Sequence, residues 1–195
     1  MSDLVFYTNP MSRGRVVRWM LEELGAPYET VLLGYGADMK APGYLAINPM
    51  GKVPAIRHGD QVVTEVAAIC TYLAEAFPEA GLAPRPEERA AYHRWMYFFA
   101  GPVEYAITNR AAGVDVEQAE RARSTGYGTM TAVLDTIEGL LAGRDHICGR
   151  FTAADVFVGS ALQWGLAFGS LPERPGFRAY ADRLAARPAA VRARA

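Results

Sequence analysis

The chain has 195 residues, of which 51% are hydrophobic, and its formal net charge at pH 7 is −1. This length is enough for one large or two small domains with a buried core. The near-neutral charge gives no reason to expect a nucleic acid or an anionic membrane as a partner. No apolar run is long enough for a membrane span, and no charged-then-apolar signal opens the sequence, so we expect a cytoplasmic protein.

Cysteine and histidine residues are few and scattered. Cys70 and Cys148 lie far apart and form neither a C-x-x-C motif nor a metal-ligand spacing. His58, His93 and His146 are equally dispersed. We therefore expect inert thiols in a reducing compartment, no metal site, and no histidine-based nucleophile.

The first third of the chain begins with a strand, a helix and a strand. Residues 4–7 predict a short buried strand. From Arg15 apolar residues recur at helical spacing until Gly25 and Pro27 end the helix, and residues 28–33 predict a second strand. This order predicts a βαβ unit whose two strands are parallel.

The next segment, residues 34–46, is rich in loop formers and contains one irregular helical turn. It leads into Asn-Pro-Met-Gly-Lys-Val-Pro-Ala-Ile at 48–56, where a turn signal and a Val-Pro bond precede a short apolar strand. Because proline has no N–H to donate, the strand edge is left open there. If the bond between Val53 and Pro54 is cis, the N–H and C=O of Val53 can face a ligand's peptide backbone.

Two further strands, 55–57 and 61–64, follow with the spacing of a hairpin. Thr64 is the expected N-cap of the next helix, and Glu65 is expected in its first turn, where the helix dipole favours an acid. A βαβ unit followed by a ββα unit is the thioredoxin-like arrangement.

The pattern Asn-Pro-x-Gly-Lys-Val-Pro-x-Ile at 48–56, followed by Thr-Glu-x-x-Ala-Ile-x-x-Tyr-Leu at 64–73, resembles the glutathione-binding half of the soluble glutathione transferases. The resemblance implies that Val53, held by the cis Pro54, pairs with the cysteinyl backbone of glutathione, the co-substrate. It implies that Glu65 holds the γ-glutamyl amine. The family usually places serine after this acid, whereas this chain has Val66, so only a backbone N–H remains there.

Beyond residue 77 the sequence changes character. Residues 78–86 carry three prolines and a glycine, the composition of a linker. We expect a thioredoxin-like domain over 1–79 and an all-helical domain over 86–195, an α/β plus all-α fold whose resemblance to the family covers nearly the whole chain. The expected helices of the second domain are 87–109, 116–141, 153–166 and 176–186.

Two local signals refine the helical domain. Gly101-Pro102 should kink or split the first of its helices, because proline cannot donate to the preceding turn. Thr152-Ala-Ala-Asp155 stands directly before an apolar run and predicts a reciprocal N-capping arrangement. The same motif begins the buried helix of the transferase family's second domain, so it supports the fold without marking a catalytic site.

The loop before the first helix offers donors for a thiolate. The glutathione thiol is mostly protonated at neutral pH, so a site that activates it must stabilise the thiolate. Ser12 is the first candidate, because a hydroxyl and a helix N-terminus can act there together; an ordinary N-cap serine is the equal alternative. Tyr7 is the second candidate and could also be core. Asn9 could donate too, and Met11 falls where serine-type classes often place their hydroxyl.

Other residues are candidates for weaker contacts. Lys52 and Lys40 could approach the glycine carboxylate of glutathione, and Arg13, opposing the helix dipole, invites an anionic partner; each can also be a solvated surface residue. Glu65 could instead be only a first-turn acid. One or two of the aromatic residues of the helical domain should line an apolar pocket for the second substrate. These are Tyr97, Phe98, Phe99, Tyr105 and Trp164.

The sequence therefore resembles a bacterial-type glutathione transferase of a serine-type or theta-like class, since the loop lacks the cysteine of the cysteine-type classes. It predicts an enzyme that stabilises the glutathione thiolate and conjugates it to, or reduces with it, an apolar electrophile. Family members are commonly homodimers. The alternative is a transferase-like regulatory or protein-interaction module that has lost catalysis, while the missing C-x-x-C argues against a thioredoxin-type disulfide reductase.

Overall fold

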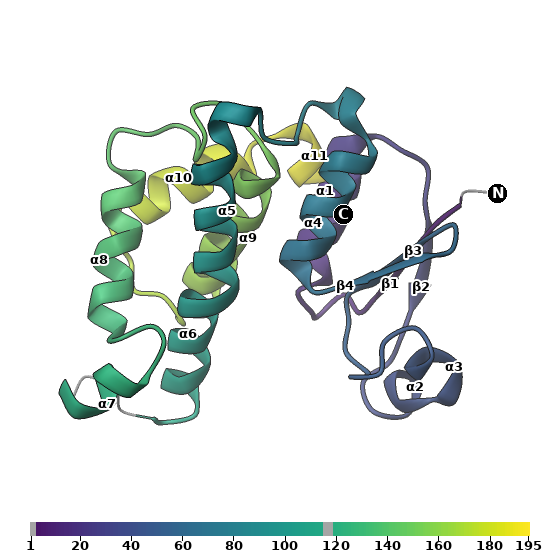
Figure 1. Ribbon diagram of the computed structural model, residues 1–195, viewed down its shortest axis with the longest axis horizontal. Helices are drawn as coiled ribbons and strands as arrows, with labels where there is room; N and C mark the ends of the chain where they lie inside the picture. The colour runs from purple at the N-terminus through teal and green to yellow at the C-terminus, as the bar shows by residue number, and fades with distance from the viewer. Residues whose placement is uncertain (1–2, 115–118) are drawn as a thin grey trace. The chain divides into compact units, whose positions relative to one another are not determined.

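The structure, a computed structural model, describes residues 3–114 and 119–195. The chain divides into two compact units (Figure 1). Unit 1 comprises Met1–Ala83 together with Pro188–Ala195, and unit 2 comprises Pro84–Arg187. The sequence-based division placed residues 188–195 in the helical domain, whereas in the structure they pack within unit 1.

Unit 1 is built on a mixed four-stranded sheet in the order β2-β1-β3-β4. Its strands are β1 (Leu4–Thr8), β2 (Glu29–Leu32), β3 (Ala55–His58) and β4 (Gln61–Thr64). Strand β1 pairs in parallel with β2 and antiparallel with β3, and β3 pairs antiparallel with β4. The predicted βαβ-ββα order is confirmed, and unit 1 has the thioredoxin-like fold.

One face of the sheet is covered by α1 (Gly14–Leu24) and α4 (Val66–Ala76), which pack against each other (Figure 1). Gly25 ends α1 in the left-handed conformation at φ 66°, as the sequence predicts. Helix α11 (Pro188–Arg194), which the sequence did not predict, packs on α1 through buried alanines and through a bond from Arg192 Nε to Glu22 Oε2 at 2.9 Å.

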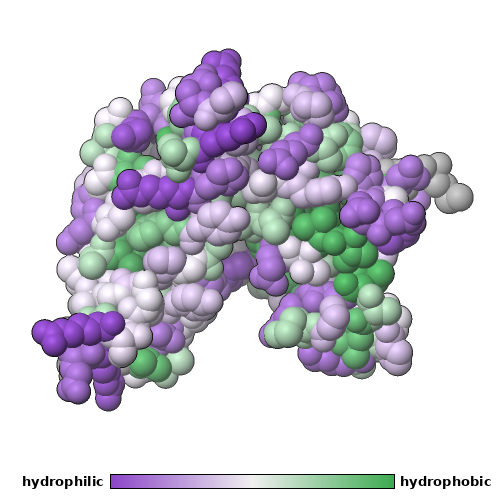
Figure 2. All heavy atoms as spheres, in the orientation of Figure 1, coloured by the Kyte–Doolittle hydropathy of each residue, from purple (hydrophilic) through white to green (hydrophobic). Residues whose placement is uncertain are grey.

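The other face carries two short helices, α2 (Ala37–Lys40) and α3 (Pro42–Leu45), where the sequence predicts a single irregular turn. Side chains alternate between the faces of a strand, so Tyr7 and Ala55, which are opposite each other in the ladder, point the same way. Both pack with Tyr44 of α3 in one hydrophobic cluster. Figure 2 also shows green, hydrophobic surface on unit 1, in keeping with the exposed apolar side chains of strands β2 and β4.

Unit 2 contains helices and no strand among its described residues, as predicted. Its helices are α5 (Arg89–Phe98), α6 (Glu104–Ala111), α7 (Ala119–Ser124), α8 (Met130–Leu141), α9 (Ala153–Ala167) and α10 (Pro175–Ala185). The first turns of α9 are buried on every side. No helix within 3–114 or 119–195 is both long and apolar enough to cross a membrane.

Two interruptions shape these helices. A π-helical turn, Phe99–Val103, separates α5 from α6, which confirms the split expected at Gly101-Pro102. The single helix expected over 116–141 is wrong: its first residues lie outside the described ranges, and the rest breaks between α7 and α8. There Gly128 takes φ 71°, and the hydroxyl of Thr129 accepts the N–H of Ala132 at 3.0 Å, which starts a new helix.

Candidate functional site

The peptide bond between Val53 and Pro54 is cis, as predicted. Pro54 is buried and directly precedes β3, whereas Val53 is half-buried. Within residues 3–114 and 119–195, no hydrogen bond engages the backbone N–H or C=O of Val53. Strand β3 lies between β1 and β4, so the expected open strand edge is wrong, and Val53 stands at the end of an inner strand. It still presents one free donor and one free acceptor there, the pair that an extended peptide needs for backbone pairing.

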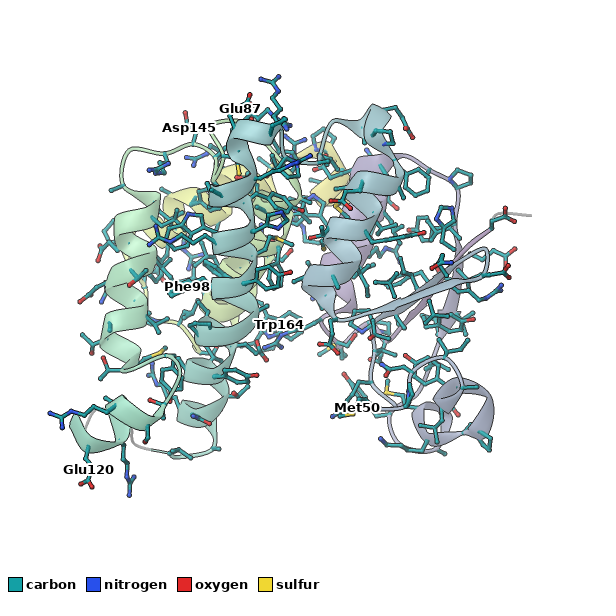
Figure 3. All side chains as sticks on the ribbon, in the orientation of Figure 1. Met50, Glu87, Phe98, Glu120, Asp145 and Trp164 are labelled. Atoms are coloured by element: carbon teal, nitrogen blue, oxygen red, sulfur yellow. The ribbon has the colours of Figure 1, made fainter. Side chains whose placement is uncertain are left out.

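The loop that carries Val53 is held from the side of α2 and α3. Gly51 has φ 57°, and a Cβ there would lie 2.5 Å from the carbonyl oxygen of Met39, so only glycine permits this close approach. The ammonium of Lys40 donates to the carbonyl of Met50 at 2.9 Å. Figure 3 shows Met50 in this loop, between α3 and β3. Lys40, predicted as a ligand of a carboxylate, thus also braces the loop.

Glu65 connects β4 to α4 in an unusual conformation. Its φ is 66° and its ψ is 121°, and no other non-glycine residue in the described ranges has a positive φ. The prediction that Thr64 caps the helix is wrong: Thr64 is the last residue of β4, Glu65 is itself the N-cap, and no side chain caps α4. The reason is that the chain turns from strand to helix at one residue, which leaves Thr64 in the sheet.

The start of α4 consequently holds two kinds of unsatisfied group. The side chain of Glu65 is exposed, and within the described residues its carboxylate forms no hydrogen bond or ion pair. The N–H groups of the first turn, beginning at Val66, receive no side-chain cap and stand at the positive end of the helix dipole. Such a site can hold a carboxylate on the N–H groups and an ammonium on Glu65, the two charges that an α-amino acid group carries on one carbon.

Ser12 lies where α1 begins, as expected, and only 9% of it is exposed. Its hydroxyl donates to the carbonyl of Asn9 at 2.7 Å and accepts the N–H of Gly14 at 2.9 Å. A Cβ on Gly14 would lie 1.9 Å from Oγ1 of Thr8, so glycine is required for this packing. The hydroxyl therefore closes the loop and directs its one proton at Asn9.

The other candidates in this loop have different surroundings. The amide of Asn9 donates to the carbonyl of Leu33 at 2.8 Å and accepts the N–H of Met11 at 2.9 Å, so it fixes the loop to the end of β2. Met11 itself is exposed. The ring of Tyr7 is half-buried, with its centroid 5.7 Å from that of Tyr44, and it packs on the same hydrophobic cluster as Val53.

Strand polarity brings these groups to one end of the sheet. The ladder pairs Tyr7 with Ala55 and Ala55 with Thr64. The end of β1, the start of β3 and the end of β4 therefore coincide, so the Ser12 loop, Val53 and Glu65 all lie at this end. Lys52 is exposed there and Arg13 is half-buried at the start of α1.

The cysteines are poor nucleophiles. Burial raises the pKa of the Cys70 thiol to about 12, and burial is also the main cause that raises the pKa of Cys148 to about 11. Both thiols are therefore protonated at neutral pH. Across residues 3–114 and 119–195, no three His, Cys, Asp or Glu side chains gather as metal ligands would.

Sequence reasoning missed two residues at the site, Tyr44 and Asn48. The hydroxyl of Tyr44 and the side-chain amide of Asn48 both donate to the carbonyl oxygen of Lys52, the latter at 2.8 Å. Asn48 opens the motif at 48–56 and could have been found as a turn residue whose side chain bonds to backbone a few residues on. The contact of Tyr44 depends on tertiary packing and left no local signal.

The aromatic candidates for a second-substrate pocket lie in unit 2 and differ in exposure. Phe99 is 2% exposed and belongs to the core. Tyr97 and Tyr105 are 70% and 60% exposed, on α5 and α6. Phe98 and Trp164, labelled in Figure 3, are half-buried on α5 and α9.

Known proteins match both the sequence and the fold. The family described as "Glutathione S-transferase, N-terminal domain" matches residues 6–81. Glutathione S-transferase 3 of Zea mays is 32% identical over an alignment that spans 97% of this chain and 92% of its own length.

Solved structures agree over almost the full chain. A glutathione transferase homologue from Sulfitobacter, with bound glutathione, superposes with a TM-score of 0.77 at 28% identity, covering 98% of this chain and 97% of that one. The theta-class glutathione S-transferase of Xanthomonas axonopodis pv. citri, also with glutathione bound, gives a TM-score of 0.75 at 28% identity, covering 99% and 97%. The chain belongs to the glutathione S-transferase family.

Proposed function

We propose that the protein is an active glutathione transferase that binds glutathione in unit 1, stabilises its thiolate and transfers it to an electrophile. The observation that carries this proposal is the conformation of Glu65. A non-glycine residue at positive φ costs of order 1–3 kcal/mol and tends to occur at functional sites. Here the strained residue sets an unpaired carboxylate beside the uncapped N–H groups of α4.

The charges of glutathione suit the free groups of unit 1. Its γ-glutamyl end carries an ammonium for Glu65 and a carboxylate for the N–H groups of α4, including that of Val66. Its cysteinyl N–H and C=O complement the free C=O and N–H of Val53. The relatives from Sulfitobacter and Xanthomonas were solved with glutathione bound, which supports this ligand.

The glycine carboxylate of glutathione needs a cation at the far end of the ligand. Lys52, exposed in the loop before Val53, is the first candidate, and Lys40 and Arg13 are the others. Both lysines are exposed, so their contacts are weak and each should change affinity by less than Glu65 does.

The sulfur of such a ligand lies toward the start of α1, where the helix N-terminus favours a negative charge. We propose Ser12 as its hydroxyl donor: to act, its proton must leave the carbonyl of Asn9 and turn to the sulfur. Tyr7 is the alternative, since the described residues offer its hydroxyl no hydrogen bond. The thiolate then forms a C–S bond with the electrophile, whose leaving group departs or whose conjugated system takes up the electron pair and a solvent proton.

Comparing Ser12→Ala with Tyr7→Phe identifies the donor. Losing the true donor should raise the pKa of the bound thiol, and each unit of rise is about 1.4 kcal/mol of lost thiolate stabilisation. The thiolate absorbance of the glutathione complex, titrated against pH, measures this directly. If Ser12→Ala leaves the titration unchanged and Tyr7→Phe shifts it upward, tyrosine is the donor.

Retention on immobilised glutathione, with release by free glutathione, tests binding, and an assay with a panel of electrophiles and peroxides tests transfer. The Glu65→Gln variant should be retained poorly, because a charge-assisted bond of about 1.5–3 kcal/mol is lost. A folded Glu65→Gln protein that binds glutathione as tightly as the parent would remove Glu65 from the site.

A regulatory or protein-interaction module that kept the fold is the second candidate function. Two observations favour it: Val66 offers no hydroxyl to the ligand, and the proton of Ser12 is already directed at Asn9. Glutathione binding without turnover of any electrophile or peroxide would support this candidate.

For the active enzyme we expect a small apolar electrophile as the second substrate, held by exposed aromatic residues of unit 2, and a homodimer.

A further inference from the structure

We infer that Tyr44 and Asn48 are positioning residues that, through the carbonyl oxygen of Lys52, aim the N–H of Val53 at the ligand. The inference rests on the proposed binding of glutathione in unit 1. It explains how the loop before β3, which has no regular structure, keeps the N–H of Val53 pointing in one direction. Neither residue has a free group for the ligand in this arrangement, so both act through the backbone of Lys52.

Two donors converge on one carbonyl. The hydroxyl of Tyr44 and Nδ2 of Asn48, at 2.8 Å, both donate to the carbonyl oxygen of Lys52. Lys52 belongs to no helix or strand, and its side chain is exposed. Without these donors its peptide group would be free to rotate. With them, both lone pairs of the oxygen have a fixed direction.

The same peptide group contains the N–H of Val53. The bond between Lys52 and Val53 is trans, because the only cis bond in the described ranges is the next one, between Val53 and Pro54. In a trans peptide plane the C=O and N–H point in opposite directions. Fixing the oxygen on the side of Tyr44 therefore points the N–H of Val53 to the other side, where it has no partner within the described residues. Hydrogen bonds to the carbonyl also polarise the group, which makes its N–H a better donor.

Both positioning residues are held in place by their own surroundings. Tyr44 is 5% exposed, and its ring packs with Tyr7 and Met39 in the cluster of unit 1. Burial is the main cause that raises the pKa of Tyr44, so its hydroxyl keeps its proton and remains a donor at neutral pH. Asn48 is buried, and its Oδ1 accepts the N–H of Met50 at 3.1 Å, which sets the orientation of its amide.

The test uses two S-methylated ligands, of which only one has the methylamide group that carries the carbonyl for the N–H of Val53. One is the methylamide of γ-glutamylcysteine, which has the cysteinyl carbonyl. The other is γ-glutamylcysteamine, which lacks it. Both carry the γ-glutamyl charges for Glu65, and neither has a second carboxylate. Calorimetry gives the affinity of each ligand for the parent protein and for Tyr44→Phe, Asn48→Ala and the double variant.

The parent should prefer the carbonyl-bearing ligand. We expect the double variant to lose about fivefold to tenfold in affinity for that ligand, as suits one weakened hydrogen bond, and less than twofold for the carbonyl-free ligand. A general loosening of unit 1 would weaken both ligands alike. Tyr44→Phe keeps the ring and its packing, so it separates the hydroxyl from the core. Tyr28→Phe, which loses a comparable hydroxyl bond to Glu22 in the same unit, is the matched control and should change neither affinity.

The outcomes separate the two proposals. If the parent prefers the carbonyl-bearing ligand and Tyr44→Phe and Asn48→Ala both keep that preference in full, the positioning role is overturned while glutathione binding stands. If the parent binds neither these ligands nor glutathione, the proposed function fails and the inference fails with it.

Discussion

The N-termini of α4 and α9 meet the same physical requirement in opposite ways. Every helix begins with N–H groups that lack intrahelical partners. At α9 the side chain of Asp155, in the first turn, accepts the N–H of the N-cap residue Thr152, whereas no side chain bonds to the start of α4 behind the strained Glu65. The first arrangement stabilises unit 2, and the second keeps polar groups of unit 1 available to a ligand.

At α9 the fully buried carboxylate of Asp155 is the centre of a hydrogen-bond network. Its Oδ2 accepts the N–H and the hydroxyl of Thr152 at 2.8 and 3.1 Å. Its Oδ1 accepts the N–H of Ile147 at 2.9 Å and the hydroxyl of Tyr180 at 2.6 Å, and Nδ1 of His146 lies 3.5 Å away. Such a network holds the helix and the loop before it in one arrangement.

At α4 the acid is Glu65, which lies on the surface and whose carboxylate has no partner within the described residues. The carboxylate of Glu65 is exposed and forms no hydrogen bond or ion pair within the described residues, and the residue occupies a backbone conformation that favours glycine. Fold stability gives no reason for this choice of residue. The contrast therefore supports the proposal that a ligand binds at the start of α4.

Removing the satisfied acid should give the largest effect on stability. We expect Asp155→Ala to lower the free energy of unfolding by about 3–5 kcal/mol, because several buried donors lose their acceptor together. Urea unfolding followed by circular dichroism measures the change. Asp135→Ala, which removes an exposed partner of Arg174, is the control and should cost less than about 1 kcal/mol. Equal losses in the two variants would contradict the comparison.

Removing the unsatisfied acid should act on binding and stability in opposite directions. We expect Glu65→Gly to reduce glutathione affinity about tenfold or more, since the acceptor for the ammonium is lost. It should raise the free energy of unfolding by about 1 kcal/mol, because glycine carries no Cβ at positive φ. Calorimetry and urea unfolding of the same preparation measure both. A variant that loses stability would show that Glu65 serves the fold.

The fall in the free energy of unfolding at alkaline pH should also depend on the α9 network. Burial is the main cause that raises the pKa of Tyr180, and the neighbouring Asp155 carboxylate adds to it. The folded state thus keeps a proton that the unfolded chain loses above pH 10, and its contribution is lost as pH rises through that range. Between pH 9 and 11 we expect the parent to lose about 1 kcal/mol more than Tyr180→Phe in urea unfolding. Parallel pH curves would contradict this.

Sequence alone could predict the satisfied start and not the open one. The Thr152–Asp155 box is local: both partners lie three residues apart, so spacing predicts their bonds. The cis bond at Pro54 was predicted from the resemblance of residues 48–56 to the transferase motif, since only about one in twenty X–Pro bonds in folded proteins is cis. At α4 the same reasoning predicted Thr64 as the cap. The prediction failed because a capping preference does not show that the residue already belongs to strand β4.

The other differences also come from contacts distant in the chain. Helix α11 forms because its alanines meet α1, far away in sequence, and short apolar periodicity near a terminus does not predict that. The break before α8 is set by Gly128 and Thr129, two signals that the surrounding helical periodicity outweighed. The hydrogen bond from the hydroxyl of Tyr44 to the carbonyl of Lys52 depends on how α3 packs against the loop that contains Lys52.

The smallest expected effect concerns the residue after the unsatisfied acid. Val66 is half-buried at the first position of α4, and its side chain offers nothing to the ligand carboxylate that the helix N-terminus attracts. We expect Val66→Ser to tighten glutathione binding about threefold to tenfold, because a hydroxyl adds one hydrogen bond to a charged group. Calorimetry on the folded variant measures the gain.

Val66→Ala is the matched control, since it removes the same methyl packing without adding a hydroxyl. Both variants should lose a similar small amount of stability, and only serine should gain affinity. If alanine gains as much as serine, the valine side chain obstructs the ligand and the hydroxyl is irrelevant. If neither gains, the carboxylate of glutathione does not reach the first turn of α4, and the uncapped N–H groups there serve some purpose other than holding the γ-glutamyl end.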